Sequence, residues 1–322
     1  MGKLASVAVN HAEQASKLRI KGLCSELWKR SRGVPLPTGN ETPLQVPPGY
    51  DLDIAQTCSF VINVACDMCE QWKAAGKPNE FSWTPSDSCP ITGPAFPLDQ
   101  WRFIGPFWSS FTPHTATVSE PFAVFAYGTD DHTAFLAFRG SQTDDDFTMD
   151  GKTRMVPYNP PMPSPINGIQ VEQGFYEVFN GLDQGELLAL MSQLAGGGRL
   201  IVTGHSLGSA LATLTVPLAC AAGIPSSSIL HYNQASPKVG DSNFQAYYNN
   251  LGVQTFRLVN TYDEVPKLPP GGYVPVGVEA PFGADYQTEA ERHNPCCSYS
   301  YALFNPTAPY NPGIDTCIAQ DS

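Results

Sequence analysis

The chain has 322 residues, of which 15% are charged and 42% are hydrophobic, and its formal net charge at pH 7 is −12. This composition is typical of a globular protein with a large core, and the acidic balance argues against nucleic acid as a partner. No uninterrupted apolar run reaches the roughly 18 residues that a membrane-spanning helix needs.

Residues 1–32 differ from the rest of the chain because they carry seven basic and two acidic residues, a net charge of +5. Their apolar side chains recur at helical spacing and predict a basic amphipathic helix: Ala15, Leu18, Leu23, Leu27 and Trp28. Met1 to Ser6 fit the N-myristoylation pattern, so peripheral membrane contact through residues 1–32 is one alternative. A helix packed on the body is the other. The segment shows no apolar core of a secretory signal, which favours a cytoplasmic or peripheral-membrane location and leaves secretion open.

Nine cysteines are present, an odd number. Two pairs are close in sequence, Cys66 with Cys69 and Cys296 with Cys297. A zinc site would require these pairs to converge. The simpler interpretation is free thiols, or one or two disulfide bonds, and no metal is expected.

The first half of the chain begins with a proline-rich connection over residues 33–50, followed by a predicted helix over residues 53–75. Residues 76–117 are expected to be irregular, and their many aromatic side chains either line an acyl pocket or pack a long loop onto the body. Residues 122–127 and 133–138 then predict a β-hairpin.

A long amphipathic helix is expected over residues 174–194, ending at three glycines. Further along the chain, residues 229–234 and 255–259 predict buried strands, separated by a helix near residues 243–248. This alternation of strands and helices favours a mostly parallel sheet covered on both faces.

The most informative motif lies at the junction of a strand and a helix. A β-branched apolar run up to Thr203 leads into Gly204-His205-Ser206-Leu207-Gly208, and helix-forming residues follow to about residue 222. This is the pattern of a nucleophile elbow, a sharp turn that exposes a serine hydroxyl. The two glycines are expected where a side chain would crowd the crossing of strand and helix. The candidate nucleophile is therefore Ser206, and the N–H of Leu207 is a candidate donor to an oxyanion.

A serine nucleophile needs a base and a residue that orients the base. In α/β-hydrolases these groups follow in the order serine, acid, histidine. We prefer His293, in a late loop, over His231, which lies inside a predicted buried strand. Asp263 follows the strand at 255–259 and is the preferred acid. Its rivals are Glu264, Asp241 and Asp285.

Taken in order, these motifs resemble the class 3 lipases, the fungal-lipase-like branch of the α/β-hydrolases. The resemblance covers roughly residues 120 to 300 and is carried by seven pieces: Phe138 to Ser141, Val171 to Phe175, Thr203 to Ala210, Ser236 to Asp241, Phe256 to Asn260, Asp263 to Pro269, and His293. It implies a catalytic α/β-hydrolase domain, which we assign to residues 51–322, preceded by the basic helix and connection of residues 1–50.

Carried over to these positions, the resemblance implies Ser206 as nucleophile, Asp263 as acid and His293 as base. It also implies an oxyanion hole formed by Ser141, through its N–H and hydroxyl, and by the N–H of Leu207. The sequence departs from the family pattern at Glu172, where a histidine is frequent. The segment 142–150, which matches the family's lid, is acidic instead of apolar.

The expected activity is hydrolysis of lipid or other acyl esters through an acyl-enzyme intermediate, without a cofactor or metal. Three alternatives stay open. One is a peptidase or amidase with the same triad. Another is a membrane-recruited phospholipase, which the basic N-terminal segment suggests. The third is a catalytically silent lipid-binding scaffold on the same fold.

Overall fold

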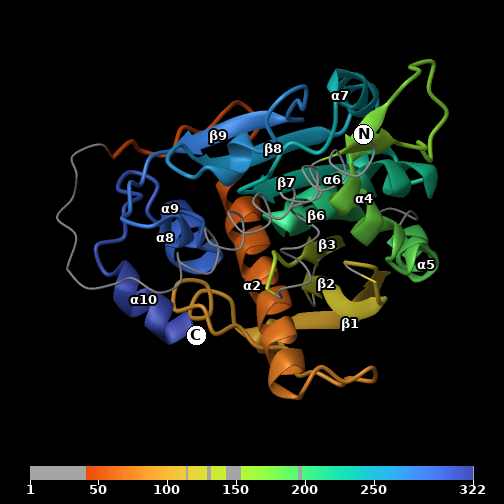
Figure 1. The fold of residues 1–322 in the computed structure, drawn as a ribbon. Helices are drawn as coiled ribbons and strands as arrows, with labels where there is room; N and C mark the ends of the chain where they lie inside the picture. The colour runs from red at the N-terminus through yellow and green to blue at the C-terminus, as the bar shows by residue number, and fades with distance from the viewer. Residues whose placement is uncertain (1–40, 114, 129–131, 143–153, 195–197, 322) are drawn as a thin grey trace, which may run out of the picture.

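The structure is a computed structural model, and it describes residues 41–113, 115–128, 132–142, 154–194 and 198–321. The expectations for residues 1–32, and for the acidic segment beyond Gln142, lie outside these ranges. Within them, one central sheet with helices on both faces forms the body of the protein (Figure 1).

The central sheet has seven strands in the described residues, in the order β1-β2-β3-β6-β7-β8-β9. The first three strands pair antiparallel, and every pairing from β3 to β9 is parallel. The bounds are β1 Trp101–Phe111, β2 Val118–Gly128, β3 Thr133–Phe138, β6 Arg199–His205, β7 Ile229–Gln234, β8 Gln254–Asn260 and β9 Val278–Phe282. The predicted α/β class with a mostly parallel sheet is therefore confirmed.

Helix α2 (Leu52–Ala74) crosses one face of the sheet (Figure 1). It begins where the carboxylate of Asp51 accepts the N–H groups of Asp53 and Ile54, as an N-cap residue does. It ends before Gly76, which has a φ of 85°. Its apolar side chains, among them Phe60, are buried against β2, β3 and β6. The helix predicted over residues 53–75 is thus confirmed.

The other face of the sheet is covered by helices α4 (Gln173–Asn180), α5 (Gln184–Leu194), α6 (Leu207–Ala221) and α7 (Ser242–Asn249). A two-stranded sheet of β4 (Met155–Pro157) and β5 (Gln170–Glu172) precedes them. The sequence predicted α6 and α7 within a few residues. The expected single helix over residues 174–194 was wrong, because the chain turns at Gly181. There the backbone N–H of Ser110 on β1 bonds the carbonyl of Gly181, and a Cβ on Gly181 would lie 2.1 Å from the carbonyl oxygen of Ser110.

Strand β1 was also missed, since its residues were assigned to an irregular segment. It lies at the edge of the sheet, and its register with β2 shifts between Ile104 and Phe107. Pro106 lies in this interval and has no N–H to donate, as is typical of proline in edge strands. The aromatic residues before and within β1 pack on the body. The rings of Phe96 and Phe60 are stacked with their centroids 5.0 Å apart, and the ring centroids of Trp101 and Phe135 are 5.8 Å apart.

The C-terminal part is built from short segments around the end of β9. They are α8 (Glu289–Arg292), the π-helix η4 (Pro295–Ser300), α9 (Tyr301–Phe304) and α10 (Ile314–Asp321). Three short 3₁₀ helices lie earlier in the chain: η1 (Leu98–Gln100), η2 (Ser226–Ser228) and η3 (Val265–Lys267). The sequence pattern did not predict these C-terminal segments. They are too short for a hydrophobic period to be visible.

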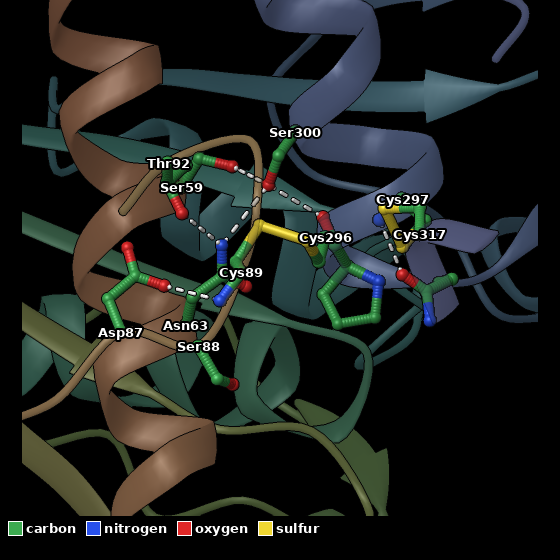
Figure 2. The surroundings of a disulfide bond; sticks show 12 residues. Ser59, Asn63, Asp87, Ser88, Cys89, Thr92, Cys296, Cys297, Ser300 and Cys317 are labelled. Atoms are coloured by element: carbon green, nitrogen blue, oxygen red, sulfur yellow. Dashed lines mark hydrogen bonds between the residues drawn. A yellow bond between two sulfur atoms is a disulfide. The ribbon is translucent and has the colours of Figure 1, made fainter. Parts of the chain in front are cut away.

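Two disulfides tie η4 to the rest of the molecule. Figure 2 shows Cys89, in the loop before β1, bonded to Cys296, and the bond between Cys297 and Cys317. In the same view, Ser300 contacts α2 through a hydrogen bond with Ser59, at 2.6 Å between the hydroxyl oxygens. The expectation of one or two disulfide bonds is borne out.

No zinc site of the considered kind forms in the described residues, because the one group of cysteines with suitable spacing is Cys296, Cys297 and Cys317. All three are engaged in the disulfides. Cys66 and Cys69 lie on α2 outside this group. No helix in the described part of the chain is both long and apolar enough to cross a membrane.

Candidate active site

The turn between β6 and α6 gives Ser206 an unusual backbone. Its φ is 56° and its ψ is −125°, a conformation that costs a non-glycine residue about 1–3 kcal/mol and is found mainly at functional sites. Gly204 and Gly208 permit the turn. A Cβ on Gly204 would lie 2.3 Å from the carbonyl oxygen of Gly208, and one on Gly208 would lie 2.3 Å from that of Phe138. The steric reason expected for both glycines is thus present.

The hydroxyl of Ser206 meets the imidazole of His293. Ser206 Oγ lies 2.7 Å from Nε2, in the geometry in which the hydroxyl donates to a neutral imidazole. His293 is the C-cap residue of α8, and its side chain is 21% exposed, so part of the ring is open to solvent. Serine and histidine are separated by 87 positions in the chain, and the fold brings them into contact.

The other ring nitrogen of His293, Nδ1, contacts Asp263. Its Oδ2 accepts the Nδ1–H of His293 at 2.8 Å, which orients Nε2 toward the serine. The carboxylate lies in the loop after β8 and is fully buried. Burial alone would raise the pKa of Asp263, but the neighbouring His293 and the hydrogen bonds from His293 and Tyr299 lower it to about 2. The group is therefore a carboxylate at neutral pH.

Tyr299, which no sequence pattern predicted, completes the surroundings of this carboxylate. Its hydroxyl donates to Asp263 Oδ2 at 2.6 Å and accepts the backbone N–H of Asn260 at 3.2 Å. The side chain is fully buried on η4, two residues after the Cys296–Cys297 pair. No spacing rule links a tyrosine on a π-helix to a distant aspartate, so the sequence contained no usable signal.

The two candidate oxyanion donors come from different segments of the chain. Leu207 is the first residue of α6, and the first N–H groups of a helix have no partner within it. Ser141 follows Gly140, whose position is close enough to the elbow that a Cβ on it would lie 3.4 Å from the Cβ of Ser206. The end of β3 and the start of α6 therefore lie side by side at the serine.

Arg139 anchors the loop that carries Ser141. Its guanidinium is fully buried and pairs with Glu120 at 2.8 Å between Nη2 and Oε2. It also donates to the carbonyls of Pro121 at 2.7 Å and Gly140 at 2.9 Å. Removing either partner would leave a buried charge uncompensated, so this pair holds the loop in place. The sequence alone does not identify Glu120 as the partner of Arg139.

The rejected rivals lie in other environments. His231 is fully buried on β7, with its Nδ1 at 2.5 Å from the hydroxyl of Tyr248. Burial lowers the pKa of His231 to about 3. Each of the three acids has its own partner: Asp241 caps α7, Asp285 pairs with Arg292, and Glu264 pairs with Lys267.

Two further polar residues are Glu172, at the start of α4, and His205, beside the candidate nucleophile. The carboxylate of Glu172 is buried and accepts the N–H of Phe175 at 2.7 Å, so it caps α4. The ring of His205 lies 4.6 Å from that of His293. Burial, followed by the nearby His293, lowers the pKa of His205 well below its ordinary value, so this ring is neutral.

Part of the chain is similar to known proteins. Residues 135–273 match the family model of class 3 lipases. A lipase of Rhizomucor miehei is 35% identical over 161 residues, which are 47% of this chain and 41% of that protein. Phospholipase A1-II 4 of Oryza sativa is 42% identical over 91 residues, 26% of this chain and 22% of that protein. The chain thus spans less than half the length of these curated relatives.

Among solved structures, the Rhizomucor miehei lipase–propeptide complex superimposes with a TM-score of 0.53 at 26% identity, covering 76% of each chain. This likeness agrees with an α/β-hydrolase fold for the described chain.

Proposed function

We propose that this chain, which belongs to the class 3 lipase family, is a serine carboxylic-ester hydrolase acting on lipid or other acyl esters. The observation that carries the proposal is the continuous line of hydrogen bonds from Ser206 through His293 to Asp263, at 2.7 and 2.8 Å. A serine, a histidine and a buried carboxylate in this arrangement form a nucleophile, its base and the group that orients the base.

In the proposed mechanism, Ser206 Oγ attacks the ester carbonyl while Nε2 of His293 takes the hydroxyl proton. The carboxylate of Asp263 keeps the Nδ1–H tautomer and stabilises the imidazolium that forms. The oxyanion accepts hydrogen bonds from Leu207 and Ser141, whose loops meet at the elbow. His293 then gives its proton to the leaving alcohol, and water hydrolyses the acyl-enzyme by the same steps. These steps use only side chains and backbone groups of this chain.

The test combines labelling with a substrate series. A fluorophosphonate should label the wild-type protein once, at Ser206, and should not label Ser206→Ala. Esters of p-nitrophenol with acyl chains of increasing length, assayed beside triglyceride and phospholipid, should then define the substrate class. Absence of labelling would favour the silent lipid-binding scaffold. Faster turnover of a matched amide than of the ester would favour the amidase alternative.

A membrane-recruited phospholipase is a second candidate, because residues 1–32 carry a net charge of +5 and part of the chain is similar to a phospholipase A1. A single myristoyl chain binds membranes only marginally, so a basic helix would have to supply the second attraction. Deleting residues 1–32 should abolish binding to anionic vesicles while hydrolysis of a soluble ester persists. Binding that survives the deletion, or that is absent before it, would exclude this candidate.

A further inference from the structure

The backbone carbonyl of Gln234, at the end of β7, holds the elbow that carries Ser206. It accepts the backbone N–H of Ser206 at 3.1 Å. The hydroxyl of Ser209, on α6, lies 2.7 Å from the same carbonyl oxygen. These bonds leave the Ser206 hydroxyl free to react and fix the backbone to which it is attached. The position of the candidate nucleophile therefore depends on where Gln234 lies.

The side chain of Gln234 begins a row of buried hydrogen bonds that leads to η4. Its Nε2 donates to the hydroxyl of Ser59, on α2, at 3.0 Å. The hydroxyl oxygens of Ser59 and Ser300 are 2.6 Å apart, and the Ser300 hydroxyl donates to the carbonyl of Pro295 at 2.8 Å. The three side chains of this row, from Gln234, Ser59 and Ser300, are at most 3% exposed. Because they are shielded from water, each depends on its partner in the row.

The direction of the row follows from the number of protons that each group can donate. Ser300 gives its hydroxyl proton to Pro295, so Ser59 gives its own proton to Ser300. Ser59 then accepts from Gln234, which assigns the amide nitrogen of Gln234, and not its oxygen, to the contact with Ser59. Each hydroxyl both accepts and donates, so removing one of them interrupts the whole row.

The other end of the row lies in the segment that carries the proposed base and its surroundings. Pro295 is the first residue of η4, and His293 precedes it by two positions. Ser300 is the last residue of η4 and directly follows Tyr299, whose hydroxyl donates to Asp263. A shift of η4 relative to β7 would therefore displace the base and the tyrosine relative to the elbow.

An asparagine and a disulfide strengthen the contact between α2 and η4. Figure 2 shows Asn63, one turn after Ser59 on α2, beside the hydroxyls of Thr92 and Ser300, to which its amide donates at 2.9 and 3.3 Å. The bond between Cys89 and Cys296 joins the loop that carries Thr92 to η4. The link from Ser59 to Gln234 extends this contact to the elbow.

We propose that Ser59, Gln234 and Ser300 are positioning residues of the proposed triad, and that their row of hydrogen bonds keeps η4 in register with the elbow. Interrupting the row loosens the alignment of His293 with the hydroxyl of Ser206. Reaction rates fall steeply when reacting groups are misplaced, even by a change far from the chemistry. The inference rests on the proposed ester hydrolase function and adds residues that support it from outside the triad.

The central test is Ser59→Ala, which removes the middle of the row and leaves both ends in the chain. On a soluble p-nitrophenyl ester it should lose roughly tenfold in kcat with little change in KM, because alignment is lost and substrate binding is not. The matched control is Ser109→Ala. Ser109 is equally buried, and its hydroxyl joins β1 to α4 by donating to the carbonyl of Val178 at 2.6 Å. The control should lose stability and keep kcat.

A double-variant cycle tests whether the row acts as a unit. Ser300→Ala should lose about as much kcat as Ser59→Ala, and the double variant should lose little more, since each change interrupts the same row. Losses that multiply would overturn the inference, as would unchanged kcat in both single variants or an equal loss in Ser109→Ala. Chemical denaturation identifies a temperature at which every variant is folded. If Ser59→Ala does not fold, Gln234→Met gives the same readout, because it removes the side-chain donor and keeps the backbone carbonyl.

A proton NMR measurement does not depend on turnover. The Nδ1–H of His293, bonded to a buried carboxylate, should give a low-field signal that is absent in His293→Ala. In Ser59→Ala this proton and the backbone N–H of Ser206 should both exchange faster with water, and in Ser109→Ala neither should change. A protein that shows these coupled changes and cleaves no ester would refute the proposed function alone. Ester cleavage with exchange rates unaffected by Ser59→Ala would refute the positioning role alone.

Discussion

The hydroxyl of Tyr299 donates to Oδ2 of Asp263 at 2.6 Å, on the same oxygen that accepts the Nδ1–H of His293. Tyr299 is carried by η4, and the two neighbouring cysteines connect η4 to the loop before β1 and to α10. The orientation of the proposed acid therefore depends on a segment that the disulfides hold in place.

Replacing Tyr299 with Phe should lower kcat by roughly tenfold, with little change in KM, because the charged carboxylate of Asp263 loses the hydrogen bond that the tyrosine hydroxyl donates. The free energy of unfolding should also fall by about 1–3 kcal/mol, since a buried carboxylate is left less well satisfied. Steady-state kinetics and chemical denaturation measure both effects. The matched control is Tyr286→Phe, another buried tyrosine whose hydroxyl accepts the N–H of Asn311 at 2.9 Å. It should lose stability and keep kcat, and an equal loss of kcat would mean that Tyr299 acts only through packing.

Ser206→Ala and His293→Ala should each lower kcat by roughly 10⁴–10⁶, and the double variant should lose little more, because triad residues act as a unit. The measurement is turnover of a soluble ester, with circular dichroism as the check on folding. Near-normal turnover in His293→Ala would show that another group serves as the base.

Ser141→Ala should lower kcat on the order of 10²-fold with KM unchanged if the serine hydroxyl donates to the oxyanion. A small loss would mean that only the backbone N–H of Ser141 takes part. An increase in KM without a change in kcat would instead assign Ser141 to substrate binding.

His231→Asn should keep turnover at pH 8 and make the protein more resistant to acid. The folded-state pKa of His231 is lowered to about 3, below its unfolded value near 6.5. The unfolded state therefore binds more protons, and His231 lowers stability as the pH falls from about 6.5 toward 3. Urea denaturation between pH 4 and 7 should show a shallower decline in the variant. Parallel declines in both proteins would contradict this account.

The last prediction concerns the segment 142–150, which carries four carboxylates and offers Phe147 and Met149 as its sizeable apolar residues. Full burial of these two side chains contributes about 1.5–3 kcal/mol each, less than the cost of placing unpaired carboxylates against oil. We expect weak or absent interfacial activation. Rates measured across the solubility limit of a short-chain triglyceride test this, and a sharp increase once droplets form would show that the apolar lid lies elsewhere, around Met155 to Pro157.

Local sequence patterns were sufficient for the parts of the site that a short stretch of chain defines. The elbow could be predicted because its two glycines and its strand-to-helix transition lie within a few residues of Ser206. Asp263 and His293 could be chosen because chain order and the end of a buried strand limit the candidates. The alternation of elements predicted the parallel half of the sheet for the same reason.

Tertiary structure decided whatever depends on contacts between distant segments. The helix expected over residues 174–194 breaks at Gly181 because β1 approaches it there, and β1 itself is stabilised as an edge strand by pairing with β2. Tyr299 reaches Asp263 from a part of the chain that no local pattern connects to it. Hydrogen bonds and charge coupling depend on distances in space, and periodicity along the sequence reports only which face of an element is buried. The groups that hold and tune the proposed triad therefore became visible only once the chain was folded.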